Sequence, residues 1–167
     1  MPKTTNKKSL AAVVGAGCCA ILLTVVPHYE GTVLKGYVDP VGIPTKCMGD
    51  THNVEVGKLY SAEECKESLE TQLIAHAEPV LRCTPGLAGK TYQLAAAVSF
   101  AYNIGPMAYC NSGTAKRFNA GDYKGACKAI NESDNGTPQW VTAKGRKLPG
   151  LVKRRADERK LCETGLG

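Results

Sequence analysis

The chain has 167 residues, a length that fits one domain with a short extension. Its 21 lysines and arginines against 15 aspartates and glutamates give a formal charge of +6, which suits an anionic partner such as nucleic acid, lipid or cell wall. Only two phenylalanines and one tryptophan are present and no basic run is interleaved with aromatic residues, so nucleic acid is the poorest of these candidates.

The N-terminus has the pattern of a membrane-directed segment. Residues 1–8 are polar and lysine-rich, residues 9–26 carry no charge, and Pro27 follows. As a helix, residues 9–26 would span about 27 Å at about 1.5 Å per residue, close to a hydrocarbon core of about 30 Å. The lysines predict a cytoplasmic start with everything after Pro27 outside. We therefore expect a segment over residues 1–27 and a separate domain over residues 28–167.

The apolar run itself is weak. Eight of its residues are Leu, Ile or Val, and another eight are Ala, Gly, Ser or Thr, so it should enter a bilayer but hold there only marginally. A cleaved signal peptide and a permanent anchor are both possible. Against cleavage, no good small-residue site lies between Leu22 and Tyr29.

The stretch from Glu30 to Thr45, EGTVLKGYVDPVGIPT, holds two carboxylates and a hydroxyl. Its glycines and prolines predict a helix end carrying Glu30 and then a turn-rich hairpin carrying Asp39 and Thr45. Two acids on different elements can face one cleft, as glycoside hydrolysis requires. The competing interpretation is a pair of solvated surface carboxylates.

Six of the eight cysteines are spread widely through the polar part of the chain and form no CxxC pair, so we expect no zinc or other metal site. Their even number favours three disulfides in an oxidising compartment, with fifteen possible pairings. We expect the pairs that close local loops between neighbouring predicted elements: Cys47–Cys65, Cys83–Cys110 and Cys127–Cys162.

Helices should make up most of the remaining chain. Residues 61–64 form a capping box that begins a helix running towards Leu81, with a break at Pro79. Residues 91–104 are the most apolar stretch after the N-terminal run, and they predict a buried central helix ending at Gly105. Two short helices are expected within residues 113–134.

Three segments resemble the phage lysozyme (endolysin) family. The first reads Glu30-Gly31, Tyr37-Val38-Asp39 and Thr45, the second is residues 98–105 and the third is residues 148–162. The resemblance covers about residues 28–163. In the third segment Arg154, Arg155 and Arg159 recur at helical spacing, which suits either salt bridges or attraction of an anionic substrate.

This resemblance implies a lysozyme-like α+β fold, mostly helical, with a small sheet at about residues 36–58. It implies hydrolysis of the β-1,4 bond between N-acetylmuramic acid and N-acetylglucosamine of peptidoglycan, by a monomer without metal or cofactor. Glu30 would be the general acid, Asp39 an ionised carboxylate and Thr45 the holder of a water. Tyr102 and Asn103 would bind sugar by stacking and hydrogen bonds, with plain core packing as the alternative for Tyr102.

One branch of these endolysins has a Gly/Ala-rich start that tethers an inactive enzyme to the host inner membrane and later releases it to the periplasm. Glu30 follows Pro27 by three residues, so a tether would pin it at the bilayer. Cys18 and Cys19 are then either apolar filler or thiols for disulfide exchange. Asp50 stands where the family often has His. It either holds the backbone of the cleft or is a simple turn residue, and we expect the turn residue.

Three other functions compete with this one. A membrane-anchored wall-binding protein would leave Glu30 and Asp39 incidental. A lytic transglycosylase would need the acid alone, so the presence of Asp39 and Thr45 argues against it. A holin-like pore protein fits poorly with one hydrophobic run and six cysteines after it.

Overall fold

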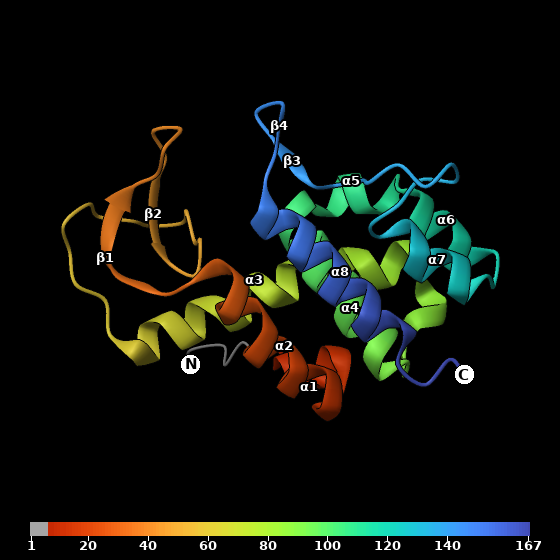
Figure 1. Ribbon diagram of the computed structural model, residues 1–167. Coiled ribbons are helices and arrows are strands. Elements are labelled where there is room, and N and C mark those ends of the chain that lie inside the picture. The colour runs from red at the N-terminus through yellow and green to blue at the C-terminus, as the bar shows by residue number, and fades with distance from the viewer. Residues whose placement is uncertain (1–6) are drawn as a thin grey trace.

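The computed structural model describes residues 7–167 and is mostly helical, with two small antiparallel hairpins (Figure 1). The helices are α1 (Leu10–Val14), α2 (Ala16–Glu30), α3 (Ala62–Cys83), α4 (Thr91–Ile104), α5 (Pro106–Cys110), α6 (Gly113–Asn119), α7 (Tyr123–Ala129) and α8 (Pro149–Glu163). The strands are β1 (Val33–Val38), β2 (Pro44–Cys47), β3 (Thr142–Ala143) and β4 (Arg146–Lys147). A mostly helical α+β architecture was expected. The β3–β4 hairpin was not.

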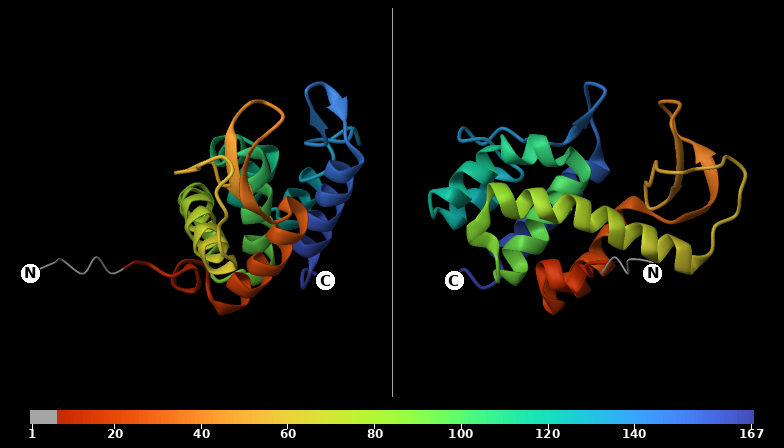
Figure 2. Two further views of the ribbon diagram at one scale, coloured as in Figure 1. Left: turned by 90° about the vertical axis from the view of Figure 1, so that its left-hand side faces the viewer. Right: turned by 180° about the vertical axis from the view of Figure 1, so that it is seen from behind.

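Helix α4 is the centre of the body. Every residue from 93 to 101 is buried, and α2, α3, α5 and α8 pack against this helix. Figure 2 shows α4 between α3 and α8. The helix ends at Gly105, whose φ of 97° lies in the region that favours glycine. The expected central helix and its end are therefore confirmed.

The β1–β2 hairpin forms most of a small sheet subdomain. Its register pairs Tyr37 with Thr45, and Leu59 bridges to Lys35 on the other edge of β1. Gly36 is required here, because a Cβ on it would lie 2.2 Å from the carbonyl oxygen of Glu55. Both hairpins rise from the same side of the helical body (Figure 1).

The uncharged N-terminal run is not the single continuous helix that a membrane span requires. It divides at Gly15, where φ is 88°, and α2 continues through Pro27 to Glu30. The boundary expected after residue 27 thus falls inside a helix. Among residues 7–167 no helix is both long enough and apolar enough to cross a membrane.

Instead, the run is part of the protein core. Its buried side chains recur at every fourth position: Leu10, Val14, Cys18, Leu22 and Val26. This spacing places them along one face of the helical segment, where α1 packs on α3 and α2 packs on α4. Small residues such as Ala16 and Ala20 lie exposed on the outer face.

Helix α3 begins at the predicted capping box. The Ser61 hydroxyl accepts a hydrogen bond from the Glu64 backbone N–H, and the Glu64 carboxylate accepts one from the Ser61 N–H. The predicted break at Pro79 is wrong, since α3 runs on to Cys83. Buried residues on either side of Pro79 hold this last turn in the core, and a disulfide from Cys83 fastens it.

Three disulfides join elements of the body: Cys47–Cys65, Cys83–Cys110 and Cys127–Cys162. They connect β2 to α3, α3 to α5, and α7 to α8. These are the pairs that local loop closure favoured. Cys18 and Cys19 are free thiols.

Candidate active site

Glu30 is the last residue of α2, and its side chain is only 22% exposed. Its Oε1 accepts a hydrogen bond of 2.7 Å from Nη1 of Arg154 on α8. Its Oε2 lies towards the loop after β2, where a Cβ built on Gly49 would be 3.5 Å away. The carboxyl group is thus held on one side by a buried cation and bounded on the other by backbone.

Arg154 is itself held tightly. Its side chain is 4% exposed, its Nη2 donates to the Ser99 carbonyl at 3.0 Å, and its Nε donates to Glu158 Oε2 at 3.2 Å. The guanidinium also lies 5.0 Å from the centre of the Tyr29 ring. Of the two roles considered for this arginine, the structure shows the salt bridge, and the partner is the candidate acid.

Two residues at the end of α4 contact the elements around Glu30: Tyr102 contacts the loop after β2, and Asn103 contacts α8. The Tyr102 hydroxyl donates to the Met48 carbonyl at 2.9 Å, and its ring stacks on His76 with centroids 4.7 Å apart. Burial raises the pKa of Tyr102, so the hydroxyl keeps its proton as a donor. Asn103 is exposed, with its Oδ1 accepting from buried Arg155 at 2.8 Å.

Asp39 and Thr45 both lie on the β1–β2 hairpin, as expected. Asp39 Oδ1 accepts backbone N–H bonds from Val41 at 2.9 Å and Ile43 at 2.8 Å. Thr45 is buried, and its hydroxyl donates to the Ile43 carbonyl at 2.9 Å. Within residues 7–167 no hydrogen bond or ion pair joins Glu30 to either of them. The site therefore offers two carboxyl groups in different surroundings.

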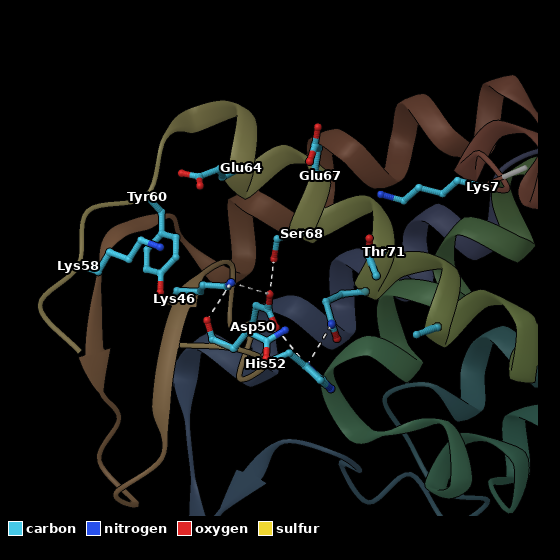
Figure 3. A pocket seen from close by; sticks show the side chains of 13 residues that line it. Lys7, Lys46, Asp50, His52, Lys58, Tyr60, Glu64, Glu67, Ser68 and Thr71 are labelled. Carbon is cyan, nitrogen blue, oxygen red and sulfur yellow. Dashed lines mark hydrogen bonds and ion pairs between the residues drawn. The ribbon is translucent and has the colours of Figure 1, made fainter. Parts of the chain in front are cut away.

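Asp50 is not the simple turn residue that we expected. It is buried, and its Oδ2 accepts from the Ser68 hydroxyl of α3 at 2.6 Å while its Oδ1 accepts from the His52 N–H at 2.9 Å (Figure 3). Lys46 lies 3.9 Å away. Burial alone would raise the pKa of Asp50, but these hydrogen bonds and the lysine outweigh it and hold the pKa below its usual value. Asp50 thus ties the loop beside Glu30 to α3.

Replacing Asp50 by asparagine should lower the free energy of unfolding by about 1.5–3 kcal/mol at neutral pH, because hydrogen bonds to a charged group are lost. A lowered folded-state pKa stabilises the fold above the unfolded pKa of about 3.9, and this stabilisation disappears as pH falls through the folded value. Urea unfolding of both proteins should therefore show the difference shrinking below about pH 4.

The matched control is Asp134→Asn, because Asp134 is an exposed aspartate with 87% side-chain exposure. Its removal should change stability by no more than about 1 kcal/mol. A stability loss in Asp50→Asn that equals the control, or that does not depend on pH, would contradict the anchoring role of Asp50.

Comparisons with known proteins identify the family of this chain. A family model described as phage lysozyme matches residues 27–158. A SAR-endolysin of Enterobacteria phage PA-2 is 31% identical over 171 residues, covering 95% of this chain and 96% of the relative.

Two solved structures are similar in fold. One is an endolysin from Escherichia coli O157:H7 phage FAHEc1, with a TM-score of 0.69 and 30% identity, over 85% of this chain and 90% of that one. The other is the active form of the P1 phage endolysin Lyz, with a TM-score of 0.75 and 24% identity, over 88% and 85%. The fold is thus lysozyme-like, and the chain belongs to the phage lysozyme family.

Proposed function

We propose that this chain is an endolysin that hydrolyses the β-1,4 bond between N-acetylmuramic acid and N-acetylglucosamine of peptidoglycan and so lyses the host cell. The observation that carries the proposal is the placement of Glu30 at the end of α2, oriented by Arg154 and followed by the hairpin of Asp39 and Thr45. No cofactor takes part in the proposed reaction.

In this mechanism Glu30 is the general acid. Arg154 engages Oε1, so the transferable proton resides on Oε2 and passes to the oxygen of the leaving sugar. Asp39 is the second carboxylate of the mechanism and stabilises positive charge on the sugar ring. Thr45 holds the attacking water, and Tyr102 and Asn103 bind sugar. Inversion at the anomeric carbon is expected if the two carboxyl groups lie more than about 6.5 Å apart.

The products of digestion test this reaction against the transglycosylase alternative. Hydrolysis adds water and creates a reducing end, whereas transglycosylation closes the muramic acid on itself as an anhydro sugar. We expect mass spectrometry of digested peptidoglycan to find reducing muramic acid ends. A digest dominated by anhydro ends would replace the hydrolase by a transglycosylase.

We further propose that residues 9–26 first tether the chain to the host inner membrane, with the N-terminus cytoplasmic, and that release delivers a monomeric enzyme to the periplasm. The name SAR-endolysin of the relative supports this. So does the continuity of α2, which carries both Val26 and Glu30. While that helix lies in the bilayer, Glu30 cannot meet Arg154. Release lets the large side chains of the run enter the core.

Two leucines on the outer face of this segment should prevent release. Ala16 and Ala20 are exposed in the folded protein, so Ala16→Leu with Ala20→Leu leaves the core intact. Each leucine favours the bilayer by about 0.3–0.6 kcal/mol. We expect the double variant to remain in the membrane fraction of expressing cells and to delay lysis.

The matched control is Ala16→Ser with Ala20→Ser, which lowers the affinity for the bilayer and should advance lysis. All three purified proteins should have equal activity in detergent-free solution. Equal lysis times for all three in cells would contradict the tether.

The two free thiols should differ in reactivity. Burial raises the pKa of Cys18 to about 12, and the half-buried Cys19 also has a raised pKa with burial as the main cause. Since the thiolate is the reactive form, iodoacetamide should label native protein at Cys19 before Cys18. If Cys18 takes part in disulfide exchange, it must do so before α2 docks. Faster labelling of Cys18 in the folded chain would contradict this order.

A further inference from the structure

A cavity of about 700 Å³ lies between the sheet subdomain and α3 (Figure 3). The loop of residues 47–50 separates it from Glu30, because Gly49 faces Glu30 while Asp50 lines the cavity. The side chains used below come from three elements: Lys46 of β2, Lys58 and Tyr60 of the following loop, and Glu64, Glu67 and Ser68 of α3.

One wall of this cavity is cationic. The ammonium groups of Lys46 and Lys58 lie 4.7 and 5.2 Å from the centre of the Tyr60 ring. Tyr60 is buried, and its hydroxyl accepts the Glu55 N–H at 2.9 Å, so the ring is a fixed platform. Lys58 is 51% exposed, and its ion-pair partner at 3.6 Å is the exposed carboxylate of Glu55. This wall can accept the carboxylate of a ligand.

The α3 side of the cavity carries the exposed carboxylates of Glu64 and Glu67, and Lys7 also lines the cavity. Glu64, Glu67 and Thr71 are spaced by three and four residues on α3, which places them on one face of the helix. Hydrogen bonds with Ser61 hold the pKa of Glu64 below its usual value, so that carboxylate is ionised at neutral pH. Ser68 and Gln72 add hydroxyl and amide groups to the same face. This wall can accept an ammonium group.

We propose that the cavity binds a peptide that carries both a free ammonium and a free carboxylate group, as the peptide branches of peptidoglycan do when they contain a diamino dicarboxylic acid. Such a ligand can pair with groups of both signs, since the cavity is lined by lysines and by the carboxylates of Glu64 and Glu67. The identification of the ligand as a peptidoglycan peptide rests on the proposed function. The charged groups of the cavity are observed independently of that function.

Binding here has a consequence for catalysis. The separating loop contacts the catalytic side through the Met48 carbonyl, which accepts from Tyr102, and through Gly49 beside Glu30. A peptide branch of peptidoglycan bound in the cavity would therefore be separated from Glu30 by this loop alone. The cavity should increase the preference of the enzyme for peptide-bearing glycan over bare glycan.

The direct test is a nuclear magnetic resonance titration of the full chain with a soluble tripeptide ending in a diamino dicarboxylic acid. We expect saturable shifts at the backbone amides of Tyr60 and Ser68. Acetylation of the distal ammonium, Lys58→Gln and Glu67→Gln should each weaken binding by about three- to tenfold, as loss of one charge pair at a binding site does. Lys35→Gln and Glu63→Gln remove exposed charges outside the cavity and should have no effect.

Shifts that do not saturate, or equal effects of cavity and control variants, would overturn the proposal. Activity then separates this proposal from the proposed function. Lys58→Gln should lower kcat/KM on peptide-bearing wall and leave the cleavage of peptide-free glycan strands unchanged. Wild-type protein that binds the tripeptide but cleaves neither substrate would refute the hydrolase and leave the peptide site standing.

Discussion

Glu30→Gln should lose lytic activity by about 10²–10⁴-fold, the contribution typical of a general acid. The glutamine amide has no proton to give to the leaving oxygen at neutral pH. Its carbonyl oxygen can still accept the hydrogen bond from Arg154 that Glu30 Oε1 accepts at 2.7 Å, so the fold should persist. The measurement is loss of turbidity of permeabilised Gram-negative cells, with circular dichroism of each protein to confirm folding.

The matched control is Glu55→Gln, which removes the same charge from an exposed loop position and should clear cells at the wild-type rate. If Glu30→Gln clears cells as fast as this control, Glu30 is not the acid. If folded wild-type protein does not clear cells at all, the non-enzymatic wall-binding alternative becomes the better account.

The part of the site predicted from the sequence is the part coded locally. Glu30, Asp39 and Thr45 fall within sixteen consecutive residues, and glycines and prolines between them predict where helix and hairpin end. The same holds for the capping box at Ser61 and for disulfides that close short loops. Neighbours in sequence set these local structures, so they can be predicted from the sequence. The roles of Glu30, Asp39 and Thr45 came from the resemblance to the phage lysozyme family and stay predictions.

Features that depend on distant partners could not be found in this way. Arg154 bonds Glu30 across 124 residues of chain. The helical spacing of Arg154, Arg155 and Arg159 fits a solvent-exposed helix as well as it fits a buried salt bridge. Asp50 looks like a turn residue until Ser68 of α3 is placed beside it. A proline inside a helix usually interrupts it. At Pro79 the helix continues, because α3 is packed in the core on both sides of the proline.

The N-terminal run shows how one sequence can suit two environments. Its overall composition is apolar enough to enter a bilayer, yet in the fold its buried side chains recur at every fourth position from Leu10 to Val26. That second pattern is helical and one-sided, so it also suits a surface helix packed on a core. Hydropathy detects the first property. The second is seen only in the fold, because Val13, Ile21 and Leu23 lie between the buried positions and hide the pattern in the sequence.

Arg154→Leu should be the most destabilising single change among those considered. The arginine is 4% exposed and pairs with Glu158, which is 1% exposed. Removing one member of a buried ion pair leaves an uncompensated charge and costs about 3–5 kcal/mol. Glu158 would keep the Ser99 hydroxyl at 2.6 Å and Arg155 at 2.6 Å as partners, which places the expected loss at the lower end of that range. Urea unfolding at neutral pH measures it.

Arg159→Leu is the control on the same helix. Arg159 is 28% exposed and pairs with the partly exposed Glu132 and Glu163, so its loss should cost about 1 kcal/mol or less. Arg154→Lys separates orientation from charge, because a lysine cannot bond Glu30, Ser99 and Glu158 in a fixed plane as a guanidinium does. It should therefore fold with wild-type secondary structure and yet clear cells more slowly per folded molecule. Equal stability of Arg154→Leu and Arg159→Leu, together with full activity of Arg154→Lys, would show that the arginine neither supports the core nor orients the acid.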